Sequence, residues 1–74
     1  MATDPVPALL ALVRDRPDPR AVSNWISAYL GKRAAPDRRR ALETLRSEFA
    51  SRLAAEPRAA GLVLRVVERF LDGT

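Results

Sequence analysis

The stretch 57–72 constrains the fold most, because its polar and apolar residues separate cleanly on a helix drawn at about 100° per residue. Every apolar residue falls in an arc of roughly 200°, and a helix of this kind needs several neighbours to cover it. We therefore expect it to lie among other helices with a narrow strip facing water. That strip of roughly 100° collects Arg58, Gly61, Arg65, Glu68, Arg69 and Asp72.

Start signals precede two further helices. An aspartate stands directly before a proline at Asp4-Pro5 and again at Asp18-Pro19. The aspartate side chain can cap a helix, with Thr3 as an alternative to Asp4 at the first one, and proline suits the first helical position, where its missing N–H costs nothing. Helices are therefore expected to begin at both prolines.

The fold class predicted from these signals is all-α, since no stretch alternates with period two as a strand would. Stops are expected before Pro17, at Gly31 and before Pro57. With 74 residues the chain should form a single α-helical domain spanning 1–74, a compact bundle with short connectors. The four expected helices cover about 5–15, 19–30, 37–55 and 57–72.

Apolar residues at helical spacing mark the side chains expected in the core. All four aromatic residues fall on these stripes, so we expect them to be packed inside rather than exposed as stacking platforms for nucleic acid. The predicted core consists of Leu10, Val22, Trp25, Ile26, Tyr29, Leu42, Leu45, Phe49, Leu53, Val63, Val67 and Phe70.

Composition argues against an enzyme. Without cysteine or histidine the chain lacks thiolate chemistry, imidazole acid–base chemistry and the usual zinc ligands. Ser23 and Ser27 have no base to activate them, and no carboxylate pair stands apart on an apolar face. We expect no catalytic residue, metal, cofactor or small-molecule substrate. The longest non-polar run, 6–13, is too short to span a membrane, so we expect a cytoplasmic protein.

The basic window, residues 32–40, carries the excess charge. It contains five basic residues, Lys32, Arg33, Arg38, Arg39 and Arg40, against Asp37 alone, so its net charge of +4 equals that of the whole chain. We expect the three consecutive arginines in the first turn of the third helix, capped by Asp37, where basic side chains oppose the helix dipole. An anionic partner would resolve that conflict, and a solvated surface patch is the alternative.

A second pattern begins in the second helix. Residues 20–25 read Arg-Ala-Val-Ser-Asn-Trp, and a glycine, a basic loop and a proline follow at 31–36. Over 20–36 this pattern resembles the recognition helix and following loop of helix-turn-helix proteins of the Cro and phage-repressor type. The chain departs from that family at 16–17, which read Arg-Pro where the family's turn carries a glycine and an aliphatic residue.

Two functions follow as hypotheses. The leading one is a small non-enzymatic helical adaptor or regulatory module that binds a protein partner, or itself, and presents the basic window to an acidic surface. If the other helices cannot cover the last helix, part of one of two sets is left for another chain: Leu62, Val66 and Phe70, or Leu64 and Leu71. Otherwise the last helix is fully covered in a monomer. The alternative, implied by the resemblance, is a DNA-binding regulator in which Arg20, Ser23 and Asn24 face the major groove while the basic window holds phosphates.

Overall fold

The computed structural model describes residues 4–73 and shows an all-α bundle of four helices, as predicted. The connectors are short, and the described residues contain no strand. The helices are α1 (Pro5–Asp15), α2 (Pro19–Leu30), α3 (Ala35–Ser51) and α4 (Pro57–Asp72).

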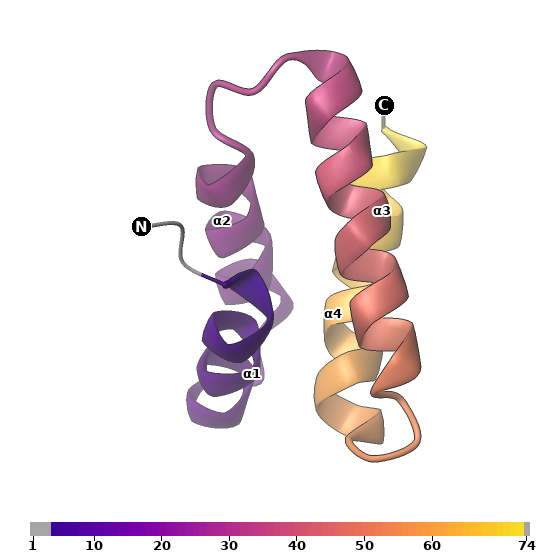
Figure 1. Ribbon diagram of the computed structural model, residues 1–74. Coiled ribbons are helices and arrows are strands. Elements are labelled where there is room, and N and C mark those ends of the chain that lie inside the picture. The colour runs from indigo at the N-terminus through magenta and orange to yellow at the C-terminus, as the bar shows by residue number, and fades with distance from the viewer. Residues whose placement is uncertain (1–3, 74) are drawn as a thin grey trace.

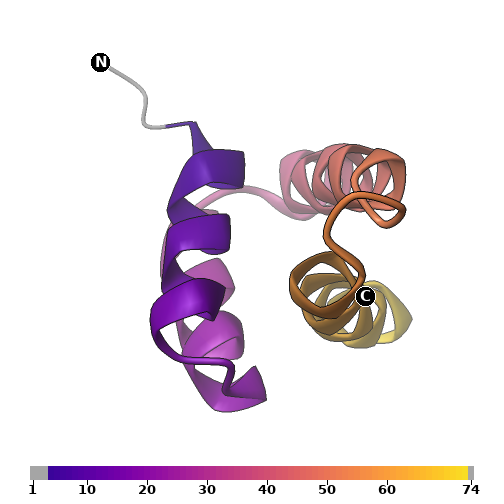
Figure 2. The same cartoon turned by 90° about the horizontal axis from the view of Figure 1, so that it is seen from below.

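The bundle consists of two helix pairs. Figure 2 shows α1 and α2 together on one side and α3 and α4 on the other, and Figure 1 shows the loop between α2 and α3 that carries the chain from one pair to the other. Helix α4 packs against all three other helices, most extensively against α3, whereas α2 and α3 have little direct contact. Helix α4 therefore occupies the central position that was expected for the last helix.

The caps at the first two helices work as predicted. Asp4 accepts a hydrogen bond from the backbone N–H of Val6 at 3.1 Å, and Asp18 accepts one from the N–H of Arg20 at 3.1 Å. Gly31 ends α2 with a φ of 52°, a left-handed value that side chains disfavour. These local interactions explain why the expected bounds of α1 and α2 are confirmed, and those of α4 are confirmed as well.

Helix α3 is shifted from the prediction of 37–55 to Ala35–Ser51. It begins earlier because Pro36 is tolerated as the second helical residue. The cap position falls on Ala34, which makes no side-chain cap bond, so the expectation that Asp37 caps this helix was wrong. It ends earlier because residues 52–55 form the turn that reverses the chain into α4.

That turn removes Leu53 from the core. The N–H of Leu53 donates a hydrogen bond to the carbonyl of Ala50, three residues back, at 3.3 Å. A bond to the third residue back forms a tighter turn than the α-helix, so the α-helix does not continue through Leu53. The side chain of Leu53 is 42% exposed, so its prediction as a core residue was wrong. Helical spacing from Phe49 indicated burial, but the helix stops before Leu53 is reached.

Every helix contributes to the core. Of the predicted core residues, Val22, Ile26, Leu42, Leu45, Phe49, Val63 and Val67 are buried, while Leu10, Trp25, Tyr29 and Phe70 are half-buried and pack against them. Burying a large apolar side chain contributes about 1.5–3 kcal/mol. The core also contains six residues that the prediction left out: Val6, Leu9, Val13, Leu30, Ala60 and Val66.

Candidate functional site

The structure does not gather the basic window on one face. Arg38, Arg39 and Arg40 are consecutive in α3, and successive helical side chains are turned by about 100° from each other. They therefore point to three different sides. Because α3 begins at Ala35, they are its fourth to sixth residues, past the first turn expected for them, and only Asp37 places a charge there. The conflict with the helix dipole is weaker than predicted.

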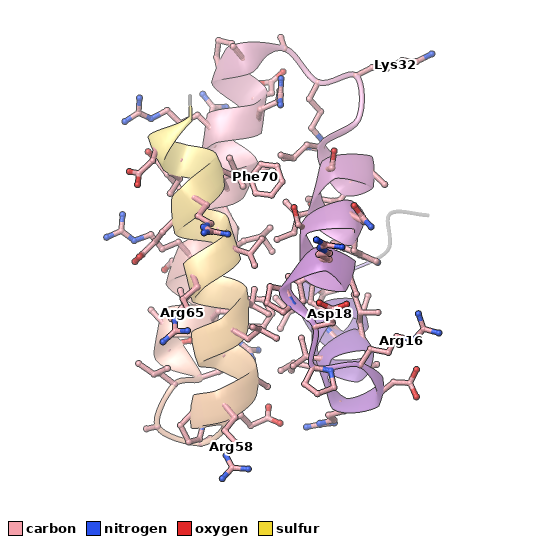
Figure 3. The ribbon with its side chains drawn as sticks, turned by 180° about the vertical axis from the view of Figure 1, so that it is seen from behind. Arg16, Asp18, Lys32, Arg58, Arg65 and Phe70 are labelled. Atoms are coloured by element: carbon pink, nitrogen blue, oxygen red, sulfur yellow. The ribbon has the colours of Figure 1, made fainter. Side chains whose placement is uncertain are left out.

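Each arginine of α3 has a different environment. Arg38 lies on the same side of α3 as Leu42 and is half-buried, and its Nε is buried without a hydrogen-bond partner in residues 4–73. Arg39 binds Glu43 at 3.2 Å on the exposed side. Arg40 is exposed and lines a cleft described below. Lys32, in the loop before α3, extends away from the bundle (Figure 3).

Arg33 belongs to a stacked column on α2. Its guanidinium carbon lies 4.9 Å from the centre of the Tyr29 ring, and that ring stacks on Trp25 at 5.3 Å with 14° between the planes. The three residues are spaced by four, so they follow one side of the helix and its end. A cation over an aromatic ring is held there by the ring's negative face. Arg33 is therefore already engaged within the molecule.

A cleft of about 510 Å³ lies between α1, α2 and α3. Its charged lining is balanced, with three acids and three arginines: Asp4, Asp37, Glu48, Arg33, Arg40 and Arg52. Glu48 and Arg52 bind each other at 2.9 Å. The positive charge that the basic window brings to this cleft is offset locally, which lowers its attraction for an acidic partner.

A second concave region lies between the start of α2 and the exposed side of α4. Two hollows of about 160 and 360 Å³ share Pro19, Val66 and Arg69, so they adjoin. Their apolar floor includes Leu62 and Phe70, and Figure 3 shows the Phe70 ring reaching from α4 toward α2. We call these two hollows, together with a third hollow further along α4, the α2–α4 groove.

The groove continues along α4 to its first turn. A third hollow of about 290 Å³ shares Leu62 and Arg65 with the second and extends to Pro57 and Arg58. Figure 3 shows Arg58 and Arg65 on the outside of α4. The whole groove thus follows about fourteen residues of α4, and apolar side chains stand at every fourth position over part of it, from Leu62 through Val66 to Phe70.

The rim of the α2–α4 groove is basic. Four arginines line it against one acid, Glu68: Arg20, Arg58, Arg65 and Arg69. Within residues 4–73 none of these arginines forms an ion pair, whereas Glu43, Glu48 and Glu56 are paired with Arg39, Arg52 and Arg14. The positive charge of this groove is therefore free to meet an anionic surface.

The three residues that the DNA-binding hypothesis expects to read bases, Arg20, Ser23 and Asn24, do not all lie in the same region of the surface. Arg20 and Ser23 line the α2–α4 groove, where Ser23 is half-buried opposite α4, and Asn24 is exposed outside it. Arg20 is at the start of α2, a helix about 18 Å long, whereas Lys32 and Arg33 of the basic window follow its other end. The structure thus does not place the predicted base-reading residues beside the predicted phosphate-binding ones.

Within residues 4–73 no group of three or more acidic side chains is placed to hold a metal ion. No helix in this part of the chain is both long and apolar enough to cross a bilayer. Comparison with protein-family models, with curated proteins and with solved structures gave no match.

The floor of the groove and three of its four rim arginines, Arg58, Arg65 and Arg69, could be placed together from the sequence, but Arg20 could not. The polar strip and the apolar row of the last helix can both be drawn from residues 57–72 alone. The contribution of Arg20 cannot, because it depends on α2 lying beside α4, and no signal in the chain specifies which helices are neighbours. Interpretation therefore favoured the basic window, where the charges are dense in sequence.

Proposed function

We propose that this protein is a non-catalytic helical interaction module that binds a partner protein in the α2–α4 groove. The observation that carries the proposal is the combination, on one face, of a partly covered apolar row with arginines that have no ion-pair partner in residues 4–73. In this row Leu62 and Phe70 are half-buried and Val66 is buried, so its apolar surface is partly accessible, and apolar surface rimmed by polar residues is typical of interaction sites. Arginine is also enriched where proteins bind each other.

The partner surface is acidic, as the sequence suggested, but the contact residues we propose differ. Arg20, Arg65 and Arg69 surround a groove with an apolar floor, so desolvation and charge can act together there. In the basic window, Arg33 is stacked on Tyr29 and Arg39 is paired with Glu43. We therefore assign the basic window a minor role in orienting the partner at longer range.

Affinity capture with matched variants tests the proposal. The protein is immobilised as wild type, as the groove variant Arg65→Glu/Arg69→Glu, and as the window variant Arg39→Glu/Arg40→Glu, each checked for helical content by circular dichroism. We expect the groove variant to lose retained partners and the window variant to keep most of them. Equal retention by all three would reject the groove. Light scattering across concentration shows whether the partner is a second copy.

DNA binding remains a second candidate because four arginines without an ion pair in residues 4–73 line one face, and phosphates would suit them. Titration with random duplex DNA at low and moderate salt tests it. Affinity falling steeply with salt, and lost in the groove variant, would favour a DNA-binding regulator. Absence of binding at low salt would remove this candidate. The cytoplasmic location and the lack of a small-molecule substrate stay predictions.

A further inference from the structure

Building on the proposed function, we infer that the occupant of the α2–α4 groove is an acidic amphipathic helix from a different protein. The inference rests on the shape of the groove, on the spacing of its apolar floor, and on the charge of its rim. Each of these narrows the class of partner separately.

The shape of the groove excludes a strand. All of its lining residues belong to α4 or to the first turns of α2. The backbone groups of helices are bonded within each helix, so they offer no edge to which a strand could add. A proline-rich segment needs a groove lined with several aromatic side chains, whereas Phe70 is the only aromatic residue lining these hollows. A helix laid along α4, with the start of α2 beside one end, needs neither feature.

The length and floor of the groove suit such a helix. The hollows follow α4 from Pro57 to Phe70, which at about 1.5 Å per residue is roughly 20 Å, or three to four helical turns. The floor residues are four positions apart on α4: Leu62, Val66 and Phe70. A bound helix with apolar residues at i, i+3 or i+4, and i+7 can pack its apolar side against such a row. The occupant is then about fourteen residues long.

The charge of the rim indicates which polar residues the bound helix should carry on either side of its apolar row. With Arg20, Arg58, Arg65 and Arg69 facing it, the helix should carry Asp or Glu next to its apolar row. A second copy of this chain does not fit. A two-fold contact through this face would oppose arginines with arginines, and none of the four helices between residues 5 and 72 carries a net negative charge.

Peptide display provides the probe. A library of random peptides of about sixteen residues is selected against the wild-type protein, and the enriched peptides are synthesised for fluorescence-anisotropy titration. We expect them to be rich in Asp and Glu, to repeat apolar residues with helical spacing, and to gain helical circular dichroism on binding. Raising NaCl from about 50 to about 500 mM should weaken their binding.

Matched variants locate the binding. The dissociation constant should rise about tenfold or more with Arg65→Glu/Arg69→Glu and less than about twofold with Arg39→Glu/Arg40→Glu. A peptide copy with Asn and Gln in place of Asp and Glu should lose affinity by a similar factor. Wild-type circular dichroism in both protein variants ensures that a loss reflects the groove and not unfolding.

Other outcomes overturn the inference in distinguishable ways. The enriched peptides could be basic, or could bind without becoming helical, while their binding still depends on Arg65 and Arg69. That result would reject the acidic helix but leave the groove as the interaction site. Peptides that bind equally to wild type and to the groove variant, or a library without enrichment, would also reject the inference. In these last cases the affinity-capture experiment decides separately whether the groove has a function.

Discussion

The basic window and the α2–α4 groove each contain four arginines, but only the groove presents them on one surface. In the window three of the four are consecutive in α3, so they point to different sides. In the groove Arg58, Arg65 and Arg69 are spaced by seven and four, so they follow one side of α4. Helical spacing, rather than density along the chain, decides whether charges act together.

The two regions also differ in what lies beneath the charges. The groove has Val66 in its floor, 5% exposed and part of the core. The cleft beside the window has acids among its arginines and an internal ion pair. Four substitutions in the two regions should affect stability to different degrees, with the largest effect in the floor of the groove and the smallest within the basic window.

The floor of the groove should be intolerant of polar side chains. Val66→Asn removes apolar contacts and buries an amide without a prepared partner, so we expect the free energy of unfolding to fall by about 3 kcal/mol. Urea unfolding followed by circular dichroism measures it. The control Thr44→Asn, on the exposed wall of the cleft beside the window, should change stability by less than about 0.5 kcal/mol. A loss below about 1 kcal/mol at Val66 would show that the floor behaves as ordinary surface.

The loop that carries the start of the basic window should depend on Gly31. Its φ of 52° and ψ of −123° suit glycine alone, and an added Cβ would lie 3.2 Å from the carbonyl oxygen of Ala28. We expect Gly31→Ala to cost about 1–2 kcal/mol in thermal or urea unfolding. Gly73→Ala is the control, because Gly73 has a right-handed helical backbone and should tolerate alanine. Equal effects at both glycines would contradict this account.

Arg38 should contribute nothing to stability as a cation. Its Nε is buried without a hydrogen-bond partner in residues 4–73, and a buried donor in that state is unfavourable. Arg38→Met keeps the length of the side chain, so we expect stability to stay the same or rise by up to about 1 kcal/mol. Arg46→Met, on the exposed side of α3, should leave it unchanged. A clear loss at Arg38 alone would show that its guanidinium holds this end of α3 in place.

The ion pair within the basic window should matter least. Arg39 and Glu43 are both exposed and place the base before the acid, the weaker order for a helical pair. We expect Glu43→Gln to cost about 0.3 kcal/mol at low salt and nothing at high salt. Glu48→Gln, which breaks a pair of the favourable order with Arg52, should cost slightly more. If parallel urea titrations gave a larger loss for Glu43→Gln than for Glu48→Gln, the expected effect of the order of acid and base along the helix would be contradicted.

Local signals explain which parts of this fold were predictable. Asp4, Asp18 and Gly31 act through neighbours a few residues away, so the bounds of α1 and α2 could be predicted from the chain. The end of α3 could not, because Pro57 stops a helix only at the residue before it. The earlier stop at Ser51 comes from the space the chain needs to reverse into α4.

Neighbour relations explain what remained hidden. Ile26 is fully buried while Trp25 and Tyr29 on the same stripe are half-buried; which residue lies at the centre depends on how the other helices cover α2. The groove depends on the same information, since Arg20 joins Arg65 and Arg69 only because α2 lies beside α4. Pairing of helices is a property of the whole bundle and is not encoded in any one segment.

The stacked column on α2 supplies a built-in optical reporter. Trp25 is the only tryptophan of the chain, and its ring is stacked against Tyr29 on the flank of α2 away from Ser23 and the groove. Indole emission should therefore follow the integrity of the first helix pair while remaining insensitive to a ligand held against α4. Fluorescence can separate events at the two sides of this small bundle without any attached label.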